Sequence, residues 1–428
     1  MAGSEYGSLF DDDGDERTVV DLDLDDQPAV PHYPALAVFG PFEILGRLAR
    51  GGMAEVYLAR EPTAEGKPRH VVLKRILPER EDDAEFIRMF REEAALARNL
   101  YHPNVCHVYE AGELDGRTFM TLEWVYGVSL RDLLRRASRQ GGIPIRIACH
   151  VAARVAAALD YVHRATGVDG KQLAIVHRDV SPHNVMIGWD GRVKLLDFGI
   201  AKTSEAEEQT EAGVLKGKHA YLAPEQARGR AVDPRTDIFA LGIVLHELLT
   251  GRPLYHREGL LPTLDAILNE PAPTTRAVRP EVPPAIDAIV LRALAKDPAS
   301  RFPTAGHLRE ALESALDTLG GAVTQSEVIE LLDARFGPDD RVPLPEQSAK
   351  LTGSFSALSE SYSSVSASYG PFGLIKKASE RPPAPAAPAG SPVAVGAKEP
   401  ISIPIPWLVA GGTALLVGAA VLTWLIAS

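Results

Sequence analysis

The sequence has 428 residues, of which 45% are hydrophobic, so the chain can form two or three domains with a sizeable core. Its two cysteines, Cys106 and Cys149, are too few for a disulfide framework and lack the spacing of metal ligands. The net charge of −12 is concentrated in residues 1–35, which carry ten acidic side chains and one arginine. The remainder is nearly neutral and has no basic face, which argues against nucleic acid as a partner.

The first 35 residues show no apolar period and contain few aromatics. Such a composition cannot bury enough apolar surface to fold, so we expect an acidic disordered tail at 1–35. A secretory signal would need a basic and then an apolar beginning, and none is expected here.

Residues 36–314 change from strand-like to helical patterns along the chain. Apolar alternation indicates strands at 42–60, where a Gly-rich stretch interrupts the pattern, and again at 70–77 and 117–125. Helical spacing of apolar residues predicts a helix at 84–100, and the chain is largely helical soon after the last strand. A small strand-rich part before a larger helical part predicts an α+β fold with two lobes.

A short helical extension is expected at 315–340, where Thr324 and Glu327 have the spacing of a capping box. Residues 341–403 are rich in serine, proline and alanine, which predicts a flexible to semi-extended linker.

The final stretch, 404–427, is expected to be a transmembrane helix. Trp407 to Ala427 contains no charge and would form about 31 Å of helix, roughly one hydrocarbon core. Trp407 and Trp424 lie near its two ends, where interfacial aromatics are common. A buried core helix is the alternative, but a helix that follows a Pro-rich linker has no evident core to pack on.

The octet "HRDVSPHN" at 177–184 places an aspartate and an asparagine in one short loop. The Asp179 carboxylate could receive a hydroxyl proton while the Asn184 carbonyl holds a metal ion. A polar turn before a strand is the alternative, because Ser-Pro-His-Asn also suits a turn.

A phosphate-binding site requires further groups, and the preceding strands offer candidates. Residues 49–56, "ARGGMAEV", form a Gly-rich turn between two predicted strands, and Lys74 ends the apolar run "VVLK". Taken singly, the first could be an ordinary hairpin and the second a solvated strand lysine. Glu93, in the predicted helix "FREEAALA", could orient Lys74 through an ion pair, with Glu92 as the adjacent alternative.

The sharpest signal is "LLDFGIAK" at 195–202, in which Asp197 follows an apolar strand 13 residues after Asn184. The tripeptide "APE" at 223–225 follows, and "DPASRF" lies near the end of the region. In this order and spacing, residues 42–314 resemble a eukaryotic-like (Hanks-type) serine/threonine protein kinase of bacteria, here with a C-terminal transmembrane anchor. The resemblance implies a bilobal fold and transfer of the γ-phosphate of ATP to protein hydroxyls, with Mg²⁺ or Mn²⁺ as the metal.

The same resemblance implies a role for each motif residue. Asp179 would orient and deprotonate the substrate hydroxyl, and Asn184 and Asp197 would hold the metal. Lys74 and Glu93 would position ATP. The positions implied to contact the nucleotide are Leu48, Ala49, Arg50, Gly51, Gly52, Val56, Val72, Lys74, Glu93, Glu123, Val125 and Met186. Structural pairing of Glu225 with Arg301, and of Asp237 with the catalytic-loop backbone, is also implied.

The chain departs from the family pattern in three places. Ala49 and Ala54 replace the outer glycines of the Gly-rich loop, and Ser181 replaces the lysine two residues after Asp179, for which Lys218 or the metal could compensate. The segment "GKHAY" at 217–221 lacks the usual threonine. A pseudokinase or a membrane-anchored interaction scaffold are therefore the alternatives. Ser/Thr specificity is preferred over Tyr because no Tyr-type catalytic loop is present.

Regulation can be anticipated from the loop after Asp197. In such kinases the arginine before the catalytic aspartate, here Arg178, reads a phosphate on that loop. Thr203, Ser204 and Thr210 are the candidate autophosphorylation sites, with Thr210 preferred. In the tail, Thr18 followed by Asp21 resembles the phosphothreonine ligand of a forkhead-associated domain, which is a possible partner.

Topology and association follow from the final helix. The kinase domain must lie in the cytoplasm with its ATP, and the lysines and arginines before the span agree with that orientation in the cell membrane. Ala410, Ala414 and Gly418 recur every four residues, a pattern that allows two helices to approach closely, so a homodimer is possible.

Overall fold

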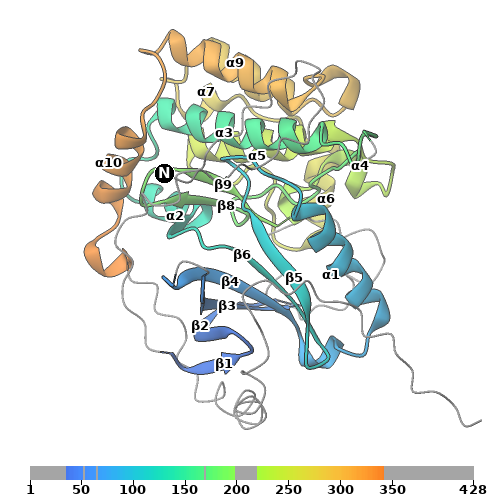
Figure 1. The fold of residues 1–428 in the computed structure, drawn as a ribbon. Helices are drawn as coiled ribbons and strands as arrows, with labels where there is room; N and C mark the ends of the chain where they lie inside the picture. The colour runs from blue at the N-terminus through green and yellow to red at the C-terminus, as the bar shows by residue number, and fades with distance from the viewer. Residues whose placement is uncertain (1–34, 52–53, 64–65, 168–169, 198–218, 342–428) are drawn as a thin grey trace, which may run out of the picture. The chain divides into compact units, whose positions relative to one another are not determined.

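The computed structural model describes residues 35–341 except 52–53, 64–65, 168–169 and 198–218. These residues form a strand-rich N-lobe and a helical C-lobe, as predicted (Figure 1). The expected tail, most of the linker and the expected transmembrane helix at 404–427 lie outside the described residues. Within the described ranges, no helix is both long and apolar enough to cross a bilayer.

The N-lobe is a six-stranded antiparallel sheet in the order β1-β2-β3-β4-β6-β5. Its outer face is closed by Phe39, Phe42 and Phe119, whose rings meet edge-on at 5.4 and 5.7 Å between Phe119 and the other two. The strands are β1 (Ala37–Phe39), β2 (Phe42–Arg50), β3 (Ala54–Glu61), β4 (Arg69–Ile76), β5 (Val108–Leu114) and β6 (Arg117–Glu123).

Helix α1 (Ala84–Ala97) packs beside this sheet, where β5 borders it (Figure 1). The Asp83 carboxylate caps its first turn by accepting from the backbone N–H groups of Glu85 and Phe86. The buried side of the helix carries Glu93 toward Lys74 on β4. This helix confirms the one predicted at 84–100, although it ends three residues earlier.

The C-lobe is built around α3 and α5, which are buried on most of their surfaces. A close approach of α5 and α8 requires Gly242, because a Cβ there would lie 3.0 Å from that of Ala293. The helices are α2 (Leu130–Ala137), α3 (Ile145–His163), α4 (Pro224–Ala227), α5 (Pro234–Thr250), α6 (Leu260–Asn269), α7 (Thr275–Val278), α8 (Pro284–Ala293), α9 (Ala305–Asp317) and α10 (Gln325–Arg335). Short 3₁₀ turns are η1 (Pro78–Arg80), η5 (Pro298–Ser300) and η6 (Pro338–Arg341).

A small antiparallel sheet lies where the two lobes meet and holds the loops that carry the motifs. It consists of β7 (Gly127–Ser129), β8 (Val185–Gly188) and β9 (Val193–Leu195). Gly127 allows β7 to reach β8, because a Cβ there would lie 2.0 Å from the Ile187 carbonyl oxygen. Because β8 and β9 are antiparallel, the residues before β8 and after β9 meet at one edge.

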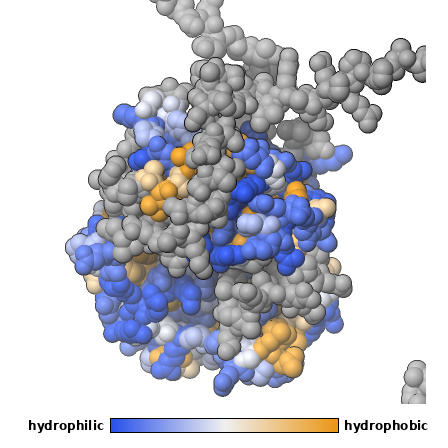
Figure 2. Space-filling model, turned by 90° about the horizontal axis from the view of Figure 1, so that it is seen from below, coloured by the Kyte–Doolittle hydropathy of each residue, from blue (hydrophilic) through white to orange (hydrophobic). Residues whose placement is uncertain are grey.

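Polar residues lie mainly on the surface and apolar residues in the interior, as expected for a packed core. On the face shown in Figure 2, the described residues are mostly hydrophilic, and apolar side chains gather in a few small patches. Most large apolar side chains lie instead in two clusters, one on the outer face of the N-lobe sheet and one that runs from that sheet through the C-lobe helices.

Candidate active site

The loop 177–184 brings the predicted aspartate and asparagine together. The Asn184 side-chain nitrogen donates to the carbonyl oxygen and to one carboxylate oxygen of Asp179, both at 2.8 Å. The Leu196 N–H donates to the Asn184 carbonyl at 2.8 Å, which places Asn184 beside the segment that carries Asp197. Asn184 and Asp197 therefore lie at the ends of neighbouring short strands, as the sequence predicted.

His177 fixes the position of this loop. Its side chain is fully buried, its Nε2 lies 2.9 Å from the Leu196 carbonyl oxygen, and its Nδ1 lies 3.3 Å from the Asp179 nitrogen. A carbonyl can only accept and a backbone N–H can only donate, so in these two contacts Nε2 is the donor and Nδ1 the acceptor. One imidazole thus ties the Asp179 backbone to the segment before Asp197. The sequence analysis assigned no role to this histidine.

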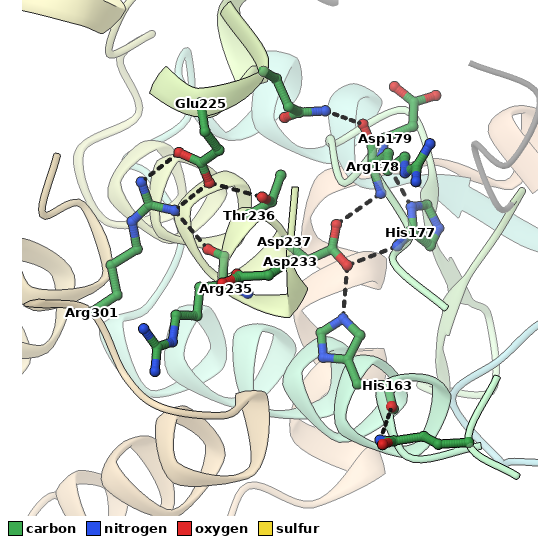
Figure 3. A network of polar contacts seen from close by, with 12 residues as sticks. His163, His177, Arg178, Asp179, Glu225, Asp233, Arg235, Thr236, Asp237 and Arg301 are labelled. Atoms are coloured by element: carbon green, nitrogen blue, oxygen red, sulfur yellow. Dashed lines mark hydrogen bonds and ion pairs between the residues drawn. The ribbon is translucent and has the colours of Figure 1, made fainter. Parts of the chain in front are cut away.

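Asp237, at the start of α5, anchors the same loop from below (Figure 3). It is fully buried and accepts from the backbone N–H groups of His177 and Arg178, both at 2.8 Å, and from His163 Nε2 at 2.7 Å. Burial acts to raise the pKa of Asp237, but the hydrogen bond and the charge of His163 and the His177 N–H outweigh it and lower the pKa. The carboxylate therefore stays ionised inside the C-lobe.

The backbone at Arg178 shows why this anchor is needed. Arg178 adopts φ of +64°, a left-handed conformation that costs energy for a residue with a side chain. Asp237 and the Gln226 side-chain amide, which donates to the Arg178 carbonyl at 3.1 Å, hold it there. Next to this left-handed residue the chain passes from the buried His177 to Asp179, whose side chain is half-buried.

Lys74 connects the two lobes. Its Nζ lies 3.0 Å from a carboxylate oxygen of Glu93 on α1 and 3.2 Å from one of Asp197 in the C-lobe. Burial opposes the charge of Lys74, but Asp197 and Glu93 outweigh it and raise the pKa of the amine above its ordinary value. Lys74 is therefore a permanent cation at neutral pH. Its partner on α1 is Glu93, the preferred alternative, whereas Glu92 pairs with Arg88.

A cavity of about 510 Å³ opens next to these groups. Of the positions predicted to contact a nucleotide, Leu48, Val72, Glu123, Val125 and Met186 line it. The positions that do not line it are Ala49, Arg50, Gly51, Val56, Lys74 and Glu93, and Gly52 lies outside the described residues. Val56 sits directly opposite Lys74 in the β3–β4 register, so both side chains lie on the same face of the sheet.

Some lining groups of this cavity, and the ion pair of the predicted Glu123, were not predicted. Glu123 is buried and forms an ion pair with the buried Lys194, with 2.8 Å between the carboxylate oxygen and Nζ. Phe336 and Asp340 reach the cavity from the C-terminal extension. Each contact joins residues far apart in the chain, and no local pattern in the sequence signals it.

The two predicted structural contacts are present. The Arg301 guanidinium donates to both oxygens of Glu225, at 2.7 and 2.8 Å, and both residues are buried (Figure 3). The second contact is that of Asp237 with the loop. Ser181, where the family pattern has lysine, is buried. Thr203, Ser204, Thr210 and Lys218 lie outside the described residues.

The oxygen donors of Asn184 and Asp197 fit a magnesium ion. The Asn184 nitrogen is used by Asp179, which leaves the amide carbonyl for a cation, and the Asp197 carboxylate is exposed. In the part of the chain that the structure describes, no group of three His, Cys, Asp or Glu side chains forms a closed cage. Mg²⁺ suits such an open site, because it binds one or two protein oxygens together with water and substrate phosphates.

The two-lobed fold with this site defines the protein kinase class, and comparison with known proteins agrees. The protein kinase domain family matches residues 42–313, so the chain belongs to that family. A structure of the Mycobacterium tuberculosis PknI kinase domain is 29% identical, with a TM-score of 0.50 over 66% of this chain and 98% of that one.

Individual relatives match about two thirds of this chain. Tyrosine-protein kinase MasK of Myxococcus xanthus is 42% identical over 284 residues, which are 66% of this chain and 44% of MasK. Serine/threonine-protein kinase PknD of M. tuberculosis is 38% identical over 65% of this chain and 40% of PknD. PrkC of Bacillus subtilis is 35% identical over 65% and 41%. The chain thus spans less than half the length of these curated relatives.

Proposed function

We propose that the chain is an ATP- and Mg²⁺-dependent protein kinase that phosphorylates serine and threonine hydroxyls of proteins. The observation that carries this proposal is the position of Lys74, which contacts Glu93 and Asp197 at once. This contact requires α1 to lie against the site and Asp197 to face it, an arrangement that phosphoryl transfer in this family needs. Relatives named as serine/threonine kinases support the choice of acceptor.

Each residue of the site would have its own role in the reaction. Asp179 would accept the proton of the acceptor hydroxyl, and the hydrogen bond that Asn184 donates to one of its oxygens orients the carboxylate. Lys74 would bind the α- and β-phosphates as a fixed cation. Asn184 and Asp197 would hold Mg²⁺, which supplies charge neutralisation on the phosphate oxygens. The apolar side chains of Leu48, Val72 and Met186 would hold the adenine ring.

Replacement of Asp179 tests the proposal. With Asp179→Asn in the full chain, transfer of ³²P from ATP to a generic basic protein should fall by at least about a hundredfold, because the proton acceptor is gone. The binding of ATP should change little. Asp317→Asn, which removes an exposed carboxylate on α9, is the matched control and should retain full activity. Equal transfer by wild type and Asp179→Asn would refute catalysis, and would favour a pseudokinase or a scaffold.

Tyrosine is the second candidate acceptor. One relative, 42% identical, is named a tyrosine-protein kinase, and Ser181 stands where serine/threonine kinases of the resembling family carry lysine. Phosphoamino-acid analysis of a protein substrate that offers all three hydroxyls would decide between them. Phosphotyrosine as the main product would overturn the Ser/Thr assignment and leave the kinase assignment intact.

Membrane tethering and regulation are further parts of the proposal. The uncharged stretch Trp407–Ala427 supports a single-pass anchor with the kinase domain in the cytoplasm. Tethering would raise the effective concentration of two copies and favour autophosphorylation in trans, with Thr210 as the preferred site. Gly418→Leu should then lower autophosphorylation in membranes, and Thr18→Ala should abolish capture of a forkhead-associated domain. An unchanged result in either assay would remove that element.

A further inference from the structure

The C-terminal extension, 325–341, returns to the region where the two lobes meet. Helix α10 runs along the side of the C-lobe near α2, and η6 follows it (Figure 1). The Tyr126 hydroxyl, which lies between the lobes one residue after Val125, donates to the Arg341 carbonyl at 2.6 Å. The family match ends at residue 313, so Arg341 and the rest of the extension lie outside the part of the chain that it covers.

Two aromatic contacts secure the extension. Phe336 is 6% exposed, and its ring meets that of Trp189 edge-on at 5.7 Å between centroids. The guanidinium of Arg341 lies over the same indole, 5.0 Å from its centroid. Trp189 follows β8, and its backbone N–H donates to the Tyr126 carbonyl at 2.9 Å. The extension is therefore joined to both the strand and the connection between the lobes.

Arg136, at the end of α2, is held by the extension on three sides. Its guanidinium lies over the Phe336 ring at 4.7 Å, donates to the Arg335 carbonyl at 3.3 Å and forms an ion pair with Asp340. The Gly337 N–H donates to the second Asp340 oxygen at 2.8 Å, which orients that carboxylate. A long side chain that would otherwise rotate in water is therefore fixed in one position.

The fixed groups form the outer wall of the cavity. Phe336, Asp340 and Arg136 line the same 510 Å³ space as Leu48, Val125 and Met186. Ser129 and Asp132 lie there too, joined by a hydrogen bond of 2.7 Å between the hydroxyl and the carboxylate. These residues give the cavity polar groups, and Lys74 does not line it, so this wall suits the ribose and the outer edge of a purine rather than the phosphates.

We propose that Phe336 and Asp340 are nucleotide-positioning residues, and that the extension completes the nucleoside end of the ATP site. This inference rests on the proposed kinase function, whose site it extends. Arg136 and the Phe336 ring are immobilised when the chain folds. Nucleotide binding therefore does not lose the conformational entropy of ordering this wall. Loss of the extension would leave the adenine cleft open on one side, and affinity for the nucleoside would fall while the catalytic groups remain in place.

Two substitutions in the full-length chain test this. Asp340→Asn removes the charge that fixes Arg136, and Phe336→Leu removes the ring beneath it while keeping an apolar side chain. Asp339→Asn is the matched control, because Asp339 is the neighbouring carboxylate on η6, is exposed and does not line the cavity. The dissociation constants of Mg²⁺–AMP-PNP and of adenosine, measured by calorimetry, are compared with the Tm of each variant.

We expect Asp340→Asn and Phe336→Leu to weaken AMP-PNP and adenosine binding by the same factor, roughly threefold to tenfold, with Asp339→Asn unchanged. In kinetic assays the KM for ATP should rise with little change in kcat. A lower Tm with unchanged dissociation constants would show a purely structural role and overturn the inference. Altered binding in a chain that transfers no phosphate would support the inference and refute the proposed function, and a wild-type chain that binds no nucleotide would refute both.

Discussion

Glu225→Gln should destabilise the chain far more than a single surface substitution can. Arg301 donates to both Glu225 oxygens and also to the carbonyls of Ala295, Arg235 and Lys296, at 2.8 to 3.2 Å. It is 2% exposed and lies over the Phe239 ring at 4.8 Å. The glutamine keeps the shape but leaves the guanidinium charge buried without a counter-ion.

The expected loss is about 3–5 kcal/mol of unfolding free energy, because an uncompensated buried charge costs that much when one partner is removed. For a domain of this size, that loss corresponds to a fall in Tm of roughly 10 °C. Removal of both charges, as Glu225→Leu with Arg301→Met, should recover most of the loss, because neither buried charge then remains. Urea unfolding followed by tryptophan fluorescence, arranged as a double-mutant cycle, measures all of these terms.

Glu92→Gln provides the matched control. Glu92 pairs with Arg88 one helical turn away, and both side chains are more than half exposed, so the loss should stay below about 0.5 kcal/mol. A loss under about 1 kcal/mol for Glu225→Gln, or a double variant as unstable as the sum of the single ones, would refute the reasoning.

Three further predictions follow from other buried contacts. His177→Phe should lower kcat by roughly tenfold or more with little change in the KM for ATP, since it frees the Asp179 backbone; a kcat within twofold of wild type would contradict this. Lys74→Met should lower kcat/KM by roughly a hundredfold or more, while Lys67→Met, on an exposed turn, should not. Burial raises the pKa of Glu247 to about 7, so its folded form holds a proton that the unfolded form has released, and stability should fall as pH rises from about 4.5 to about 7. Glu247→Gln should flatten that fall. If the urea midpoints of this variant depend on pH as steeply as those of the wild type, Glu247 is not its cause.

The predicted ion pairs are present because their residues are fixed by short local elements. Lys74 ends an apolar run whose strand period sets the face that it occupies, and Glu93 lies on the buried side of a helix whose period is equally regular. Asp197 and Asn184 stand at the ends of strands that pair through the hairpin between them. In each case, local periodicity orients the side chain, and the fold only has to bring the elements together.

The contacts that the sequence did not predict have no local signal. The Glu123–Lys194 pair and the Arg136–Asp340 pair join residues 71 and 204 positions apart. A buried lysine in β9 and a carboxylate after a short helix have unremarkable sequence surroundings. Strand β5 was also missed, because it lies at the sheet edge, where only Val108 of its residues is fully buried and apolar alternation is weak.

The site divides between one rigid frame and one adjustable contact. Asp179, Asn184 and His177 belong to a single buried network with Asp237, whose members all lie in the C-lobe and can shift only if the helices around α5 repack. Lys74 and Glu93 lie in the N-lobe and reach Asp197 through one ion pair of 3.2 Å on a half-exposed carboxylate. Since an ion pair on an exposed carboxylate contributes little free energy, this contact can open at small cost while the proton-accepting loop keeps its shape. We therefore expect bound nucleotide to hold Lys74 and Asp197 together more firmly than this ion pair does, and the proposed role of Phe336 and Asp340 concerns that same binding step.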